Sequence, residues 1–152
     1  QLYASKTSLG NNAQCSFVTH SETLLKLKAL KISIQSLRYK LIIYKILRAE
    51  EWAILRDNGK SQGAPIDIKD GYIHFSTANT VSETANKYFK NEDDLMLLAF
   101  NDTDLGKNLK YEKSRGGLLF PHLYDELNLD DALWIKPLIK EGKSHVFPED
   151  LK

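Results

Sequence analysis

The chain has 152 residues and a formal net charge of +1, with one cysteine, Cys15. This length predicts a single domain, and one cysteine excludes an intrachain disulfide, which is typical of a protein of the reducing cytoplasm. Residues 1–40 are basic and the remainder is mildly acidic, so we expect no nucleic-acid partner, and no apolar run approaches the roughly 20 residues of a membrane-spanning helix.

Residues 1–40 differ in character from the rest of the chain. Residues 1–20 are polar and lack periodicity, which predicts disorder, whereas residues 21–40 have the pattern of a basic amphipathic helix. Two interpretations stay open: a leader with a membrane-surface or targeting role, or an upstream extension that is not native, with translation starting near Leu41. We therefore predict a leader over residues 1–40 and one domain over residues 41–152.

The first half of this domain alternates strands and helices. Residues 41–47 predict an apolar strand, and residues 48–58 predict a helix that Gly59 ends. The expected buried residues of this helix are Trp52, Ile54 and Leu55. Residues 60–69 are expected to form a loop, followed by a turn and a strand over residues 72–76. A second helix is expected over residues 80–90, with inward residues Val81, Thr84, Ala85, Tyr88 and Phe89.

The second half is mostly strands. Residues 94–100 are almost all apolar and predict a central strand, and a short strand is expected over residues 109–112. Residues 120–126 are expected to be irregular because a proline interrupts them, and residues 132–138 predict an edge strand because of Pro137. This order predicts an α+β fold: a compact single domain with small mixed or antiparallel sheets and flanking helices.

The segment Tyr72-Ile73-His74-Phe75-Ser76-Thr77 is the first that carries chemistry. Alternation along a strand places Tyr72, His74 and Ser76 on one face and the apolar residues on the core face. In a functional interpretation, His74 hydrogen-bonds a ligand hydroxyl, Ser76 lies beside it and Tyr72 stacks on the ligand. In the alternative, the strand is half-exposed and the histidine is incidental.

The second such segment runs from residue 111 to residue 124. Arg115 precedes Gly116 and Gly117, a pattern that suits an anion held by backbone amides and a guanidinium, although a simple hairpin turn explains it equally well. Glu112 at a strand end is a candidate catalytic carboxylate or a solvated charge, and His122 is a candidate ligand contact or a packed ring. The catalytic set we predict is His74, Glu112 and Arg115; the ligand-binding set is Tyr72, Ser76, Thr77, Gly116, His122 and Tyr124.

Other site patterns are absent from the sequence. The four histidines and the cysteine lack metal-ligand spacing, so we expect no metal site. The chain also contains no P-loop, dinucleotide-binding fingerprint or nucleophile elbow.

Over about residues 42–140 the chain resembles a bacterial family named domain of unknown function 952 (DUF952). The motifs that carry the resemblance occur in order: Tyr44-Lys45-Ile46-Leu47, Glu51-Trp52, Asp70-Gly71-Tyr72-Ile73-His74-Phe75-Ser76-Thr77-Ala78, Thr84-Ala85, Glu112-Lys113-Ser114-Arg115-Gly116-Gly117 and Phe120-Pro121-His122-Leu123-Tyr124. One difference is Asp125, where the family has glycine.

The resemblance implies an ADP-ribosyltransferase-like fold, in which two small sheets enclose NAD, with likeness to the RNA 2′-phosphotransferase branch of that group. It further implies that His74 contacts a ribose hydroxyl, Ser76 supports the pocket wall, Arg115 faces a phosphate and Glu112 stabilises an oxocarbenium charge. We thus expect a cleft for a small-molecule partner: NAD as cofactor, or a related nucleotide or phosphorylated metabolite. An ADP-ribosyl- or phosphotransferase-like enzyme is one hypothesis, and a non-catalytic module that binds a metabolite or a protein is the other.

Overall fold

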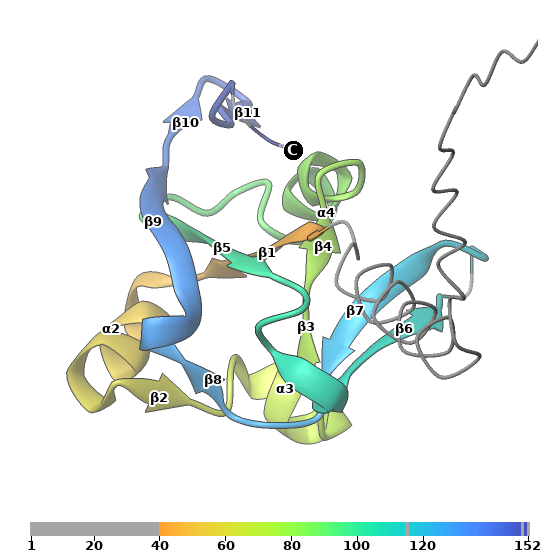
Figure 1. Cartoon of the computed structure of the whole chain (residues 1–152). Helices are drawn as coiled ribbons and strands as arrows, with labels where there is room; N and C mark the ends of the chain where they lie inside the picture. Colours follow the sequence, from red (N-terminus) through yellow and green to blue (C-terminus); the bar gives the residue numbers. More distant parts are fainter. Residues whose placement is uncertain (1–39, 115, 150, 152) are drawn as a thin grey trace, which may run out of the picture. The chain divides into compact units, whose positions relative to one another are not determined.

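The computed structural model describes residues 40–114, 116–149 and 151, which belong to one compact unit of the chain (Figure 1). The predictions for residues 1–39 and for Arg115 therefore lie outside the described residues. Within the part described, no helix combines the length and the apolar character that crossing a bilayer requires.

A four-stranded antiparallel sheet forms the centre of this unit. Its strand order is β4 (Ser76–Thr77), β1 (Ile42–Leu47), β5 (Leu95–Asn101) and β9 (Ala132–Leu138). The predictions of β5 as an inner strand and of β9 as an edge strand are both confirmed. Pro137 is tolerated in β9 because one side of an edge strand has no neighbouring strand, so the N–H that proline lacks is not required for pairing there.

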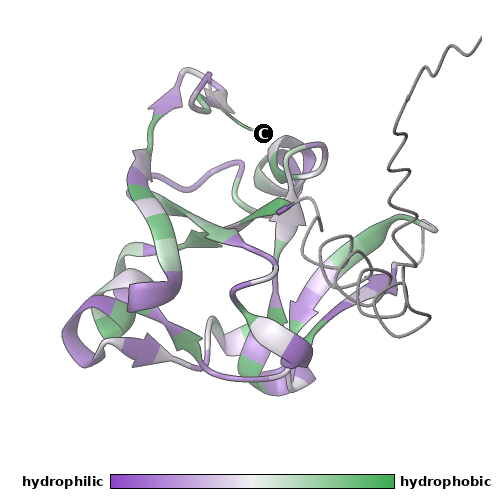
Figure 2. Cartoon of the chain, viewed as in Figure 1, coloured by the Kyte–Doolittle hydropathy of each residue, from purple (hydrophilic) through white to green (hydrophobic). Residues whose placement is uncertain are grey.

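Both faces of this sheet are buried, which explains why β1 and β5 are almost continuously apolar. Ile43 and Leu47 of β1 belong to one core cluster with Phe75 and Phe100, whereas Tyr44 and its neighbours belong to a second cluster on the other face. Figure 2 shows the hydrophobic colour concentrated on β1 and β5 and the hydrophilic colour on the hairpin of β10 (Lys140–Glu141) and β11 (Ser144–His145).

The two predicted helices are present, but each turns a slightly different face to the core. In α2 (Ala49–Asn58), which ends at the left-handed Gly59 with φ 72°, the buried residues are Glu51 and Leu55. Trp52 packs against the core as predicted, whereas Ile54, on the opposite flank of the face formed by Glu51 and Leu55, is 52% exposed, contrary to prediction. In α4 (Val81–Tyr88), Val81 and Ala85 are buried as predicted, but Tyr88 at the fraying end is 61% exposed.

A second, three-stranded antiparallel sheet has the order β3 (Ile73–His74), β7 (Leu119–Leu123) and β6 (Leu109–Lys113). The expectation of irregular structure over residues 120–126 is therefore wrong for residues 120–123, which belong to β7, whereas residues 124–126 are irregular as predicted. Pro121 pairs with Tyr111 of β6 and accepts a hydrogen bond from Phe75 N at 2.9 Å. A proline cannot return that bond, so the pairing of β3 with β7 ends there.

The predicted strand over residues 72–76 is interrupted at Phe75. β3 pairs with β7 and β4 pairs with β1, so the two halves of this segment belong to different sheets. Ile73 and Phe75 are buried as the alternation predicts.

The predicted loop over residues 60–69 is also wrong. It contains β2 (Lys60–Ser61), paired with β8 (Leu127–Asn128), and the short helix α3 (Pro65–Asp70), whose first residue is a proline. Proline suits the first position of a helix because the N–H it lacks would have no partner there. Two 3-10 turns, Gly106–Asn108 and Leu129–Asp131, complete the described elements, and the α+β prediction with antiparallel sheets is confirmed.

Candidate functional site

One face of the three-stranded sheet is polar, and three basic side chains form a row across it. His74 of β3 is directly opposite His122 of β7, and His122 is directly opposite Lys110 of β6. Directly opposed residues share a face of a sheet. The alternate residues Ile73 and Leu123 are buried in the core, so the row lies on the face turned away from the core.

Asp67 of α3 fixes the orientation of His74. The Asp67 side chain is fully buried, and its Oδ1 accepts hydrogen bonds from His74 N at 3.0 Å and from His74 Nδ1 at 2.7 Å. Its Oδ2 accepts from Ala64 N at 2.7 Å and from Lys45 Nζ at 2.5 Å. The Nε2 of His74 lies 3.4 Å from an oxygen of Asp70.

Lys45 is a cation inside the core, on the same face of β1 as Ile43 and Leu47. Burial lowers the pKa of Lys45 below its usual value, while Asp67 opposes this shift. Burial raises the pKa of Asp67, but hydrogen bonds from His74 and the charge of Lys45 outweigh burial and lower it to about 2. Asp67 is therefore an ionised acceptor at neutral pH, so His74 Nδ1 must donate.

A second histidine–carboxylate pair lies beside the first. Glu112 Oε2 accepts hydrogen bonds from His122 Nδ1 and from Tyr124 OH, both at 2.8 Å. The hydrogen bond from His122 has the largest effect on the pKa of Glu112 and lowers it, and the hydrogen bond from Tyr124 lowers it further. The same bond to Glu112 raises the pKa of Tyr124. The ammonium nitrogen of Lys110 lies over the ring of Tyr124, 4.1 Å from the ring centroid.

Tyr72 joins the two histidine pairs. Its ring stacks on His122 at 4.4 Å between centroids and contacts His74 at 4.8 Å and Tyr124 at 5.2 Å. The rings of His74 and His122 are 5.2 Å apart in an edge-to-face arrangement. Four aromatic rings thus form one cluster, in which carboxylates hold the polar groups of His74, His122 and Tyr124.

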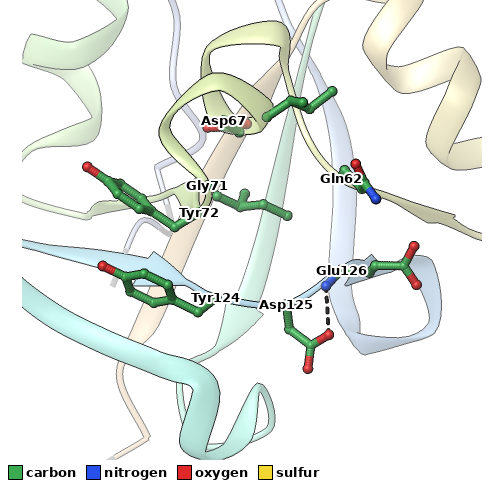
Figure 3. A pocket seen from close by; sticks show the side chains of 9 residues that line it. Gln62, Asp67, Gly71, Tyr72, Tyr124, Asp125 and Glu126 are labelled. Carbon is green, nitrogen blue, oxygen red and sulfur yellow. Dashed lines mark hydrogen bonds between the residues drawn. The ribbon is translucent and has the colours of Figure 1, made fainter.

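A cavity of about 300 Å³ adjoins this cluster. Its lining includes Tyr72 and Tyr124 on one side and Gln62 and Glu126 on the other. Figure 3 shows the two tyrosine rings extending in the same direction, away from Gln62 and Glu126. Tyr72 and Tyr124 therefore belong both to the aromatic cluster and to the wall of the cavity.

The remaining predicted site residues lie elsewhere. Ser76 is buried in the four-stranded sheet and donates to Thr84 Oγ1 at 3.0 Å, so it is not beside His74. The hydroxyl of Thr77 hydrogen-bonds the hydroxyl of Thr80 in the following turn. Gly116 lies in the exposed turn between β6 and β7. The role predicted for Arg115 stays a prediction.

The sequence interpretation missed Lys45, Asp67 and Lys110. A lysine within the apolar run of residues 41–47 was a usable signal, because a buried cation requires a buried partner. Asp67 was hidden by the assumption that residues 60–69 form a loop. Lys110 becomes relevant only through its register opposite His122.

No group of histidine, cysteine and carboxylate side chains among the residues with described positions could hold a metal ion. Asp125, where the resemblance led us to expect a glycine, does not adopt a left-handed backbone: the non-glycine residue with positive φ in the described part is Asp94. Asp125 instead accepts hydrogen bonds from Asn108 Nδ2 at 2.7 Å and from Glu126 N at 2.8 Å.

Residues 46–135 match the family described as protein of unknown function (DUF952). The chain belongs to this family. A crystal structure of protein CC0527 from Caulobacter crescentus is similar at 38% identity, with a TM-score of 0.66, over 68% of this chain and 91% of that one. The solution NMR structure of CC0527 has a TM-score of 0.62 at the same identity, over 68% of this chain and 90% of that one. No curated protein matches the chain.

Proposed function

We propose that the polar face of the three-stranded sheet binds NAD or a related nucleotide. The observation that carries this proposal is the aromatic cluster, in which Tyr72 contacts the rings of His74, His122 and Tyr124. Planar rings at a ligand site favour stacking with a planar base. The adjacent cavity of about 300 Å³ is of the size that small ligands occupy.

Polar groups around this cluster suit the rest of a nucleotide. His74 is the proposed contact for a ribose hydroxyl, because Asp67 fixes its ring. Lys110 is exposed at the end of the basic row, and together with Arg115 it is the proposed contact for phosphate. The same chemistry also suits a phosphorylated metabolite.

The proposal includes an ADP-ribosyltransferase-like fold in a cytoplasmic protein, with transfer of an ADP-ribosyl or phosphoryl group as the reaction. Glu112 would face the developing charge in an ADP-ribosyl transfer. One observation favours the alternative of a non-catalytic binding module: Oε2 of Glu112 already accepts two hydrogen bonds, from His122 and Tyr124.

Calorimetric titration of the full chain with NAD, ADP-ribose and AMP tests the proposal. We expect Tyr72→Leu to weaken binding by about 5-fold to 160-fold, because stacking on an aromatic side chain contributes about 1–3 kcal/mol per base. The matched control is Tyr88→Leu, which removes a tyrosine that is 61% exposed on α4. Arg115→Lys should also weaken binding, because it removes the planar fork but keeps the charge. Absence of binding by all three compounds would contradict the proposal.

A further inference from the structure

We propose that His74 and His122 are an acid–base pair that hydrolyses a phosphodiester bond in a small nucleotide, such as a 2′,3′-cyclic nucleotide. This inference rests on the proposed function, since it assigns a substrate class and a reaction to the same face. It does not require NAD to be the ligand.

Each histidine is held by a carboxylate at Nδ1, and the two rings are neighbours. His74 Nδ1 lies 2.7 Å from Asp67, and His122 Nδ1 lies 2.8 Å from Glu112. The ring centroids are 5.2 Å apart, on paired strands and on one face of the sheet. A carboxylate on one ring nitrogen fixes the orientation of the imidazole and leaves its other nitrogen for proton exchange; in His74 that nitrogen also faces Asp70, at 3.4 Å.

The surroundings of the two rings suggest different roles. His74 has a carboxylate near both nitrogens, with Asp70 3.4 Å from Nε2, so it is placed to carry a proton on each. His122 has one carboxylate partner, Glu112; apart from His74, its neighbours include Tyr72 and, one strand away, Lys110. We therefore assign His74 as the acid and His122 as the base.

The proposed hydrolysis requires no reactant other than water. Water attacks phosphorus and forms a P–O bond while its proton moves to Nε2 of His122. The bond from phosphorus to one ribose oxygen breaks, and that oxygen takes the proton from Nε2 of His74. The product is a phosphomonoester with a free hydroxyl, and proton exchange with solvent restores both rings. Lys110 would stabilise the charge on the phosphoryl oxygens.

Two observations favour a small substrate and water as the nucleophile. The domain is net acidic over residues 41–152, which does not favour binding of a long polyanion. The hydroxyls of Ser76, Thr77, Thr80 and Thr84 hydrogen-bond one another around the start of α4. Because these hydroxyls are engaged with one another, we assign water as the attacking group.

The test is hydrolysis of 2′,3′-cyclic AMP by the full chain, followed by phosphorus NMR in the presence of EDTA. We expect a phosphomonoester product and a bell-shaped dependence of kcat/KM on pH, as two groups in opposite protonation states require. His74→Gln and His122→Gln should each lower kcat about 100-fold or more. His145→Gln, in β11, is the control histidine and should retain the wild-type rate.

A second pair of variants tests Lys110. Lys110→Met should raise KM or lower kcat/KM at least tenfold, whereas Lys136→Met should not, although Lys136 likewise lies over an aromatic ring, that of Trp134, at 4.7 Å. Binding of 2′,3′-cyclic AMP without hydrolysis would overturn the acid–base assignment and leave the proposed nucleotide site standing. Absence of both binding and hydrolysis would overturn this inference, whereas the proposed nucleotide site is decided by the separate titration with NAD, ADP-ribose and AMP. Because the pH profile uses the wild-type chain, misfolded variants cannot conceal the outcome.

Discussion

Replacing Asp67 with asparagine tests whether the buried carboxylate stabilises both the domain and the site. Each oxygen of Asp67 accepts two hydrogen bonds, one pair from Lys45 and Ala64 and the other from His74. An asparagine side chain presents one oxygen and one NH₂ group. In either orientation, the NH₂ group therefore faces two donors, and the buried charge of Lys45 loses its counterion.

The expected loss of stability is large. Removing one partner of a buried ion pair costs about 3–5 kcal/mol, because the other charge stays buried without compensation. A domain of this size has about 5–15 kcal/mol of stability in total, so Asp67→Asn should retain a fold but a weakened one. The exposed pair of Arg56 and Asp57, with side chains 55% and 62% exposed, supplies the matched control. Asp57→Asn should cost less than about 1 kcal/mol.

Urea unfolding of both variants, followed by circular dichroism, measures these costs. The double variant Lys45→Met/Asp67→Asn adds a sharper criterion, because removing both charges also removes the uncompensated cation. The loss of stability in this double variant should be smaller than the sum of the losses in Lys45→Met and in Asp67→Asn by at least about 1 kcal/mol. If Asp67→Asn costs no more stability than Asp57→Asn, or if the losses in Lys45→Met and Asp67→Asn are additive, the reasoning about Lys45 and Asp67 is refuted.

Two further outcomes follow from the same carboxylate. Because folding lowers the pKa of Asp67 from 3.8 to about 2, ionised Asp67 contributes about 2 kcal/mol to the free energy of unfolding above pH 4. This contribution is lost as the pH falls toward 2. Unfolding measured across this pH range should show the loss in the wild type but not in Asp67→Asn. Gly63→Ala should cost more than the roughly 1–2 kcal/mol expected for Gly59→Ala: both glycines have positive φ, 88° and 72°, but an added Cβ at Gly63 would meet the Asp67 side chain, whereas Gly59 faces open space. Equal melting temperatures of the two glycine variants would contradict this.

Much of the fold could be predicted because periodicity and burial agree there. Residues 42–47, 95–101 and 132–138 are strands as expected, and the glycine after α2 ends that helix. The failures are local. Pro121 indicated irregular structure, but its carbonyl still pairs and its missing N–H falls where β3 ends. Tertiary pairing thus outweighed the local preference of one residue.

The grouping of side chains at the candidate site could be predicted in part for a similar reason. His74, His122, Glu112, Tyr72 and Tyr124 were selected from two segments, and the structure brings these segments together through the pairing of β3 and β7. Alternation failed for Ser76 because the strand is interrupted at Phe75, which moves Ser76 into the other sheet. Lys45 and Asp67 are 22 positions apart in the sequence, and their pairing depends on tertiary structure alone.

The double pairing of β7, with β3 on one side and β6 on the other, restricts how this segment can change in length. A one-residue insertion or deletion within Leu119–Leu123 would exchange the two faces of the strand, placing His122 toward the core and Leu123 toward solvent. Such a change would lose the core and the site together. Length variation between β6 and β7, around the exposed Gly116 and Gly117, carries no such penalty. Strand register therefore constrains the spacing from Pro121 to Tyr124 more tightly than the length of the hairpin tip.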